Sequence, residues 1–244
     1  MTKKVLYNVI KEYPKMIQII IYKEPQAVYD GMRTRRTHDK VEDDYLTLER
    51  SIRRSKATIR DLVICNNFDL FCTFTFDPKK HDRYNFNSLK LTMLRWLNNQ
   101  RRQHSPNLQY LVIPEFHKDG AIHFHALLKN YRGNVKKTGK KTKKGKNEVF
   151  NLPSFRGGFT TASPINENIE AVAEYVSKYI TKELIKTFNQ NRYFCSQGLI
   201  RPKKYNNKFV WIPRLKAKKL YDTKYYQTFL IENTIDNKKQ LMLD

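Results

Sequence analysis

Three side chains near the middle of the chain have the types and the spacing to hold a divalent cation. Two apolar runs flank the short loop Lys118–Gly120, and a loop that ends in glycine is typical of a hairpin closed by a type I turn and a bulge. In such a hairpin Glu115 pairs with His123, and the period of two places His125 on the same face. One carboxylate and two imidazoles then converge, with coordination positions left for water or substrate. The alternative is that both histidines are ordinary polar residues of an exposed sheet.

The segments around this hairpin alternate between helical and strand patterns, which predicts an α+β fold. Apolar residues recur at helical spacing in the first and second helix, and the second has Asn87 or Ser88 as its expected N-cap. Ser163 and Pro164 are the expected start of a third helix. The expected elements are a basic amphipathic helix at 42–64, a strand at 69–76, a helix to about residue 102, the hairpin, a strand at 158–162 and a helix to about residue 184.

The third helix carries residues that suit phosphodiester chemistry. A helical wheel brings Tyr175, Lys178, Tyr179 and Lys182 together beside the apolar face that must pack on the sheet. A tyrosine hydroxyl attacks a phosphodiester if a cation stabilises the developing charge, and a nearby lysine adds a second positive charge. The alternative for each tyrosine is a packed ring with a hydrated hydroxyl. Spacing alone leaves two possible nucleophiles, since both tyrosines begin a YxxK pattern.

The composition points to nucleic acid as the partner. The chain of 244 residues contains 47 Lys and Arg against 23 Asp and Glu, a formal net charge of +24, together with 15 Tyr and 14 Phe. There is no apolar run of transmembrane length and no signal-peptide pattern, so we expect no membrane partner and a cytoplasmic location. The three cysteines form no CxxC pair, which disfavours a cysteine-ligated zinc site.

The densest run of positive charge lies at 132–148. This segment has low complexity and few apolar residues, so we expect a mobile loop that contacts nucleic acid. Gly139 and Gly145 are five residues apart where a phosphate-binding loop has four, which excludes a nucleotide site of that type. The lysines expected to bind nucleic acid are Lys136, Lys137, Lys140, Lys141, Lys143 and Lys144, with Lys182 on the third helix.

Three motifs occur together in a recognisable order. They are Phe71–Phe76 (FCTFTF), Glu115 with His123-Phe124-His125, and Tyr175–Tyr179 (YVSKY). In this order the chain resembles HUH endonucleases, and specifically rolling-circle replication initiator (Rep) proteins of bacterial plasmids and phages. The resemblance covers roughly residues 45–205.

The resemblance implies a ferredoxin-like fold, with a central antiparallel sheet of about five strands, the histidine strand in its middle and helices packed on one face. It implies an endonuclease domain at 41–205 between a helical N-terminal extension, 1–40, and a basic aromatic C-terminal extension, 206–244. The aromatic residues of the tail suggest either a single-strand platform or a packed extension. These residues are Tyr193, Trp211, Tyr221, Tyr225 and Tyr226.

The resemblance also implies a reaction. Tyr175 would attack a phosphodiester of single-stranded origin DNA, leaving a 5′-phosphotyrosine and a free 3′-OH, and reversal would rejoin the strands. Glu115, His123 and His125 would ligate Mg²⁺ or Mn²⁺, Lys178 would lie near the tyrosine, and a host helicase and polymerase would act with the protein. An HUH transposase or relaxase is an alternative, and a non-catalytic nucleic-acid-binding module is an alternative of another class.

Overall fold

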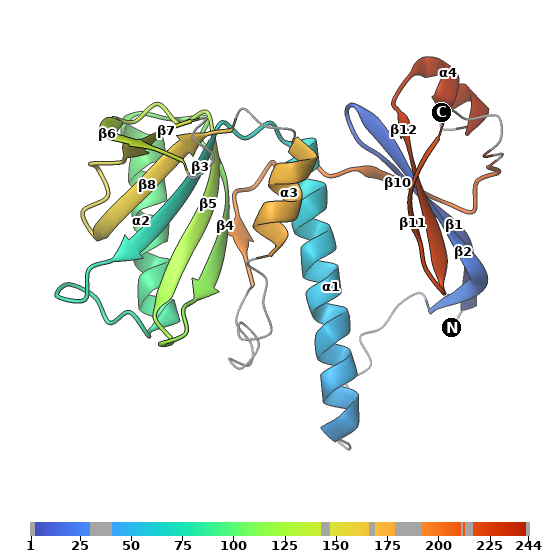
Figure 1. Cartoon of the computed structure of the whole chain (residues 1–244), viewed down its shortest axis with the longest axis horizontal. Coiled ribbons are helices and arrows are strands. Elements are labelled where there is room, and N and C mark those ends of the chain that lie inside the picture. Colours follow the sequence, from blue (N-terminus) through green and yellow to red (C-terminus); the bar gives the residue numbers. More distant parts are fainter. Residues whose placement is uncertain are drawn as a thin grey trace. The chain divides into compact units, whose positions relative to one another are not determined.

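A computed structural model of the chain describes residues 3–29, 41–142, 147–165, 169–178, 192–210, 212 and 217–242. The fold is α+β, with two antiparallel sheets and, in the described part, four helices (Figure 1). The chain divides into two compact units: residues 41–200 form the larger unit, and residues 1–40 together with 201–244 form the terminal unit. None of the described helices is both long and apolar enough to cross a membrane.

The larger unit contains a seven-stranded sheet in the order β6-β7-β8-β3-β5-β4-β9. The histidine strand β5 lies inside the sheet between β3 and β4, as expected, but the sheet exceeds the predicted five strands because β6 and β9 extend its two edges. Its strands are β3 (Leu70–Phe76), β4 (Gln109–Phe116), β5 (Ile122–Lys129), β6 (Lys136–Lys141), β7 (Glu148–Asn151), β8 (Gly158–Pro164) and β9 (Phe194–Cys195).

One face of this sheet packs on α2 (Phe86–Gln103) through a core rich in aromatic rings. Alternate strand residues such as Phe74 and Phe124 are fully buried there, since side chains of a strand alternate between its two faces. The N-cap is Asn85, whose Oδ1 accepts a hydrogen bond from Ser88 N at 3.1 Å, so the prediction of Asn87 or Ser88 was wrong. The helix begins earlier because Phe86, its first residue, is buried in the core.

Helix α1 (Val41–Cys65) confirms the predicted basic helix, and it contacts α3 (Ile169–Ser177). Helix α3 starts later than expected: Pro164 still pairs with Leu70 in the sheet, so Ser163 and Pro164 end a strand and do not begin the helix. The predicted continuation to residue 184 lies outside the described residues, which resume at 192.

The lysine-rich segment is not simply a loop. Residues 136–141 form the edge strand β6, which pairs with β7, and Thr138 Oγ1 donates to Val149 O at 2.7 Å. Main-chain pairing with a neighbouring strand orders this segment even though most of its side chains are exposed. A pattern of few apolar residues therefore predicted exposure correctly but missed the strand. Residues 143–146 lie outside the described part.

The terminal unit is a five-stranded sheet in the order β10-β1-β2-β12-β11 (Figure 1). The expected helical N-terminal extension was wrong, because isoleucines at alternate positions of β2 give a strand one apolar face. The described part of the C-terminal extension packs against these N-terminal strands. The elements are β1 (Lys3–Glu12), β2 (Met16–Tyr29), β10 (Lys203–Asn206), β11 (Lys218–Asp222), β12 (Tyr226–Glu232) and the short helix α4 (Ile235–Gln240).

Candidate active site

The hairpin of β4 and β5 has the register that its turn residues predict. Gly120 N donates to His117 O at 2.9 Å, and His117 N donates to Ala121 O at 2.9 Å. Gly120 has φ of +84°, the left-handed conformation that glycine adopts without strain at the end of such a turn. Glu115 therefore lies directly opposite His123, as predicted.

Glu115 and His125 meet on the sheet face that points away from α2. Glu115 Oε2 lies 2.6 Å from His125 Nε2, so the predicted acid and imidazole are in direct contact. The His125 side chain is almost completely buried, and that of Glu115 is about two-thirds buried. A hydrogen bond this short between an acid and an imidazole is strengthened by charge on either partner.

Two threonines of β3 hold the other ring nitrogens. Thr73 Oγ1 lies 3.2 Å from His125 Nδ1, and Thr75 Oγ1 lies 2.9 Å from His123 Nδ1. Because each hydroxyl occupies Nδ1, Nε2 is the ring nitrogen left to bind a ligand. The arrangement follows from the register, in which Thr73 pairs with His125 and Thr75 with His123.

The surroundings keep the two kinds of donor in their ligand-binding protonation states. Burial lowers the pKa of His123 to about 4, and positive charge on His117 and His125 lowers it further. The His117 ring packs on the His123 ring, with centroids 3.8 Å apart. The hydrogen bond from His125 is the largest cause of the lowered pKa of Glu115. At neutral pH His123 is therefore neutral and Glu115 is ionised.

A carboxylate oxygen and imidazole nitrogens are a donor set that suits Mn²⁺, and the carboxylate also suits Mg²⁺. Glu115 Oε2 and His125 Nε2 already face each other, and His123 lies two residues along the same strand on the same face. Within the described ranges, no three or more His, Cys, Asp or Glu side chains are gathered closely enough to form a metal site. The donor chemistry fits a divalent cation, and His123 must turn toward the pair to complete the site.

Tyr175 on α3 reaches the same face through one intervening ring. Its ring contacts Phe71 edge-on with centroids 5.6 Å apart, and Phe71 stacks on His125, also at 5.6 Å with an interplanar angle of 14°. Tyr175 is half exposed, so the phenol is accessible beside a largely buried histidine. Lys178 follows the helix with an exposed side chain, and its N–H donates to Tyr175 O at 3.2 Å. Tyr179 and Lys182 lie outside the described residues.

The structure does not bring the lysine-rich strand to this pair. β6 is four strands from β5 in the sheet order, a separation of about 19 Å at the usual strand spacing. The side chains of Lys136, Lys137, Lys140 and Lys141 are exposed on that edge, while Lys143 and Lys144 lie outside the described residues.

Sequence reasoning missed the polar and aromatic residues that surround the histidines. Phe71, Thr73 and Thr75 share the histidine face, while Phe74 and Phe76 point into the core. The alternation of threonine with phenylalanine in FCTFTF was the available signal. Its use depends on knowing that β3 is the neighbour of β5, and that pairing joins segments about fifty residues apart.

A comparison with protein families indicates the class of protein. Residues 69–184 match a family model described as replication-associated protein of the ORF2 type. The matched segment contains the Glu115–His125 pair, both threonines and Tyr175. This match supports a replication initiator of the Rep type, with a role in DNA replication in a plasmid or phage context and with DNA as a binding partner. No curated protein and no solved structure gives a match.

Proposed function

We propose that this Rep-type protein is an endonuclease of the HUH class, which nicks one DNA strand at a replication origin with Tyr175 as nucleophile. The observation that carries the proposal is the row of side chains from Glu115 through His125 and Phe71 to Tyr175. It joins a buried acid–imidazole pair to an accessible phenol within the segment that the replication family model covers.

In the proposed reaction, Tyr175 Oη attacks the phosphorus of one phosphodiester of single-stranded DNA. A new P–O bond forms to the tyrosine, the bond from phosphorus to the 3′-oxygen breaks, and the phenol proton is balanced by protonation of that oxygen. The products are a 5′-phosphotyrosine and a free 3′-OH that serves as a primer for a host polymerase. Attack by a 3′-OH on the phosphotyrosine reverses the reaction and rejoins the strands.

Each residue of the site has a distinct part in this proposal. Glu115, His123 and His125 would hold Mg²⁺ or Mn²⁺, which when bound supplies positive charge to the scissile phosphate. Thr73 and Thr75 orient the two imidazoles through Nδ1. Lys178 and the exposed lysines of β6 contribute positive charge to hold the strand, and a host helicase opens the duplex ahead of synthesis.

Adduct formation tests the proposal directly. The protein is incubated with Mn²⁺ and 3′-labelled single strands that tile the replicon encoding it, and the products are separated under denaturing conditions. We expect one strand to become covalently attached to the protein. Tyr175→Phe removes the hydroxyl and should abolish the adduct, whereas Tyr84→Phe, another exposed tyrosine of the larger unit, should leave it unchanged.

The same assay can overturn the proposal in two ways. An adduct that persists in Tyr175→Phe and disappears in Tyr179→Phe would move the nucleophile to Tyr179. The absence of an adduct with every strand, while the strands still bind, would favour a non-catalytic nucleic-acid-binding module. Glu115→Gln tests the metal separately, since we expect it to weaken Mn²⁺ binding measured by calorimetry as well as nicking.

A further inference from the structure

The two faces of the terminal sheet differ in character. On one face, six apolar side chains form a buried cluster, and the end of α4 covers it through Leu241. They are Ile10, Ile17, Ile19, Phe229, Ile231 and Leu241. The strand register assigns a second set of residues to the opposite face, and most of these are half-buried or exposed.

Three tyrosines gather at one end of that opposite face. Tyr22 and Tyr226 are direct cross-strand partners, and Tyr221 pairs with Thr228, which places it diagonally beside Tyr226. Tyr221 is 53% exposed and Tyr226 is 36% exposed. Burial raises the pKa of Tyr22, with proximity to Tyr226 as a second cause, so these phenols are neutral and close together. The face therefore presents adjacent aromatic rings to solvent.

A row of lysines crosses the same face further along the strands. Lys204 pairs with Lys11, Lys11 with Gln18, Gln18 with Leu230, and Leu230 with Lys218. Two lysines directly opposite each other repel, so an anion bound between them would offset a cost that the sheet otherwise bears. We call Tyr22, Tyr221, Tyr226, Lys11, Lys204 and Lys218 the tyrosine–lysine face.

The charge of the whole terminal unit has the same sign. Residues 1–40 and 201–244 contain twenty Lys and Arg against eight Asp and Glu, while residues 41–200 contain 27 against 15. The two units thus have equal excess positive charge, but the terminal unit carries it on about half as many residues. Such a charge density favours a polyanionic ligand.

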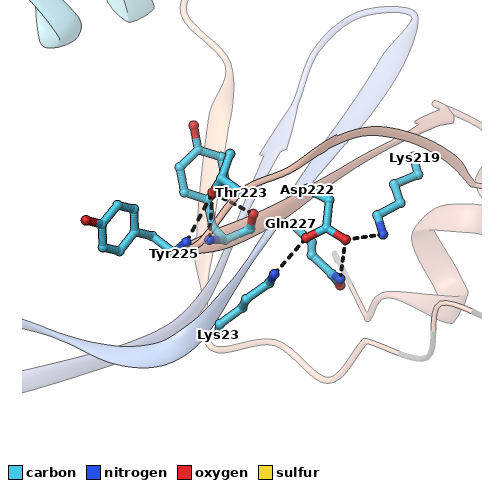
Figure 2. Close-up of polar contacts among 7 residues, drawn as sticks. Lys23, Lys219, Asp222, Thr223, Tyr225 and Gln227 are labelled. Carbon is cyan, nitrogen blue, oxygen red and sulfur yellow. Dashed lines mark hydrogen bonds and ion pairs between the residues drawn. The ribbon is translucent and has the colours of Figure 1, made fainter.

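The acidic residue nearest the tyrosines is neutralised by its own partners. Asp222 forms ion pairs with Lys23, at 2.8 Å, and with Lys219, and it accepts a hydrogen bond from Gln227 (Figure 2). Its hydrogen bond with Lys219 is the largest cause of its lowered pKa. These contacts remove a negative charge that would otherwise repel a polyanion at this end of the sheet.

The β11–β12 turn holds the tyrosine backbone in place. Thr223 N donates to Tyr226 O at 2.9 Å, and Thr223 Oγ1 accepts from Tyr225 N and Tyr226 N at 3.2 and 3.0 Å (Figure 2). Because the turn is already ordered, a ligand that contacts Tyr226 loses little free energy in fixing it. Lys224 lies 5.9 Å from the centre of the Tyr225 ring at the tip.

We propose that the tyrosine–lysine face binds a single strand of nucleic acid, separately from the nicking site. Unpaired bases would stack on the tyrosines, and phosphates would lie along the lysine row. A duplex hides the faces of its bases, so the tyrosines would contribute nothing to binding it. The inference depends on the surface of the terminal unit alone and does not require the nicking chemistry.

Cross-linking of the full chain locates the strand. The probe is an oligothymidylate of about 16 nucleotides, within the range of known single-strand sites, with 5-iododeoxyuridine in place of some thymidines. EDTA is present so that no metal-dependent nicking occurs. After irradiation we expect peptides with Tyr22, Tyr221 or Tyr226 among the cross-linked products. Cross-links confined to residues 41–200 would overturn the proposal.

Affinity measurements with matched variants test stacking. Tyr221→Ser with Tyr226→Ser should weaken binding of the oligothymidylate by about tenfold or more, since each stacked base contributes roughly 1–3 kcal/mol. Tyr221→Phe with Tyr226→Phe keeps both rings and should bind like the unaltered chain. An abasic strand of equal length should be insensitive to all four substitutions. Equal losses for the serine and phenylalanine pairs, or for duplex and single strand, would contradict stacking.

The lysine row has its own control. Lys218→Gln should reduce the slope of log affinity against log salt by about one, because one phosphate contact is lost. Lys239→Gln removes an exposed lysine of α4, which lies on the covered side of the sheet, and should leave that slope unchanged. Equal slopes for both variants would mean that the positive charge acts without a located strand and would overturn the lysine part of the proposal.

Discussion

The two units are both built on antiparallel sheets, but the chain assembles them in opposite ways. The larger unit uses the continuous segment 41–200, and its histidine site depends on a hairpin with a three-residue loop. The terminal unit joins both ends of the chain: Tyr7 N donates to Asn207 Oδ1, 200 residues away, and β2 pairs with β12. Local register therefore positions the catalytic candidates, whereas long-range pairing creates the tyrosine–lysine face.

The largest effect should follow from breaking the long-range pairing. Removal of residues 226–244 deletes β12 and α4, and with them Phe229, Ile231 and Leu241 from the core of the terminal sheet. We expect amide protons of β1 and β2 to lose protection from hydrogen exchange almost completely, because an isolated two-stranded hairpin is marginally stable. Peptides from β3, β4 and β5 should keep theirs.

The reciprocal substitution completes the comparison. Phe124 is fully buried among Phe76, Phe86 and Phe194, so Phe124→Ala should lower the free energy of unfolding of the larger unit by about 3–5 kcal/mol. Phe159→Ala, at an exposed position of β8, should cost about 0.5 kcal/mol or less. If either change altered exchange in both units equally, the division into two units would not describe the folding of the chain.

A smaller effect is expected from the threonines that orient the histidines. Thr75→Val keeps the shape of the side chain but removes the hydroxyl 2.9 Å from His123 Nδ1. Loss of such an outer contact typically weakens metal binding by about 10- to 100-fold, and we expect the lower value for Mn²⁺ measured by calorimetry. Thr75→Ser retains the hydroxyl and should recover most of the affinity. Equal affinities for all three proteins would exclude an orienting role for Thr75.

The pH dependence of stability should reveal the burial of His123. Its pKa falls from 6.5 to about 4 on folding, so between these values the unfolded chain binds more protons than the folded one. In EDTA, stability should be unaffected by this group above pH 6.5 and should decrease as the pH falls toward 4. The unfolding free energy of His123→Gln should decline less steeply over that window. Parallel curves for the two proteins would show that His123 titrates normally.

Prediction from the sequence succeeded where the determining residues are close in the chain. The loop Lys118–Gly120 specifies its own turn, and the turn specifies which residue faces Glu115. Helix α1 was likewise predicted within about one residue from its apolar spacing. The strands β1 and β2 were missed because their partners lie at the other end of the chain, and β6 was missed because main-chain pairing leaves little trace in side-chain composition.

The smallest predicted effect distinguishes two lysines of the strand that was expected to be a loop. Lys137 Nζ lies 3.1 Å from Glu148 Oε2, so part of its charge is compensated on the neighbouring strand β7. Lys140 is exposed on the same strand. If β6 contacts a DNA backbone, Lys140→Gln should lower the salt slope of binding by about one, and Lys137→Gln by less. Filter binding of single strands at several salt concentrations measures both slopes. Because β6 is an ordered strand, its lysines have fixed neighbours and should differ, whereas in an unstructured loop all would contribute alike.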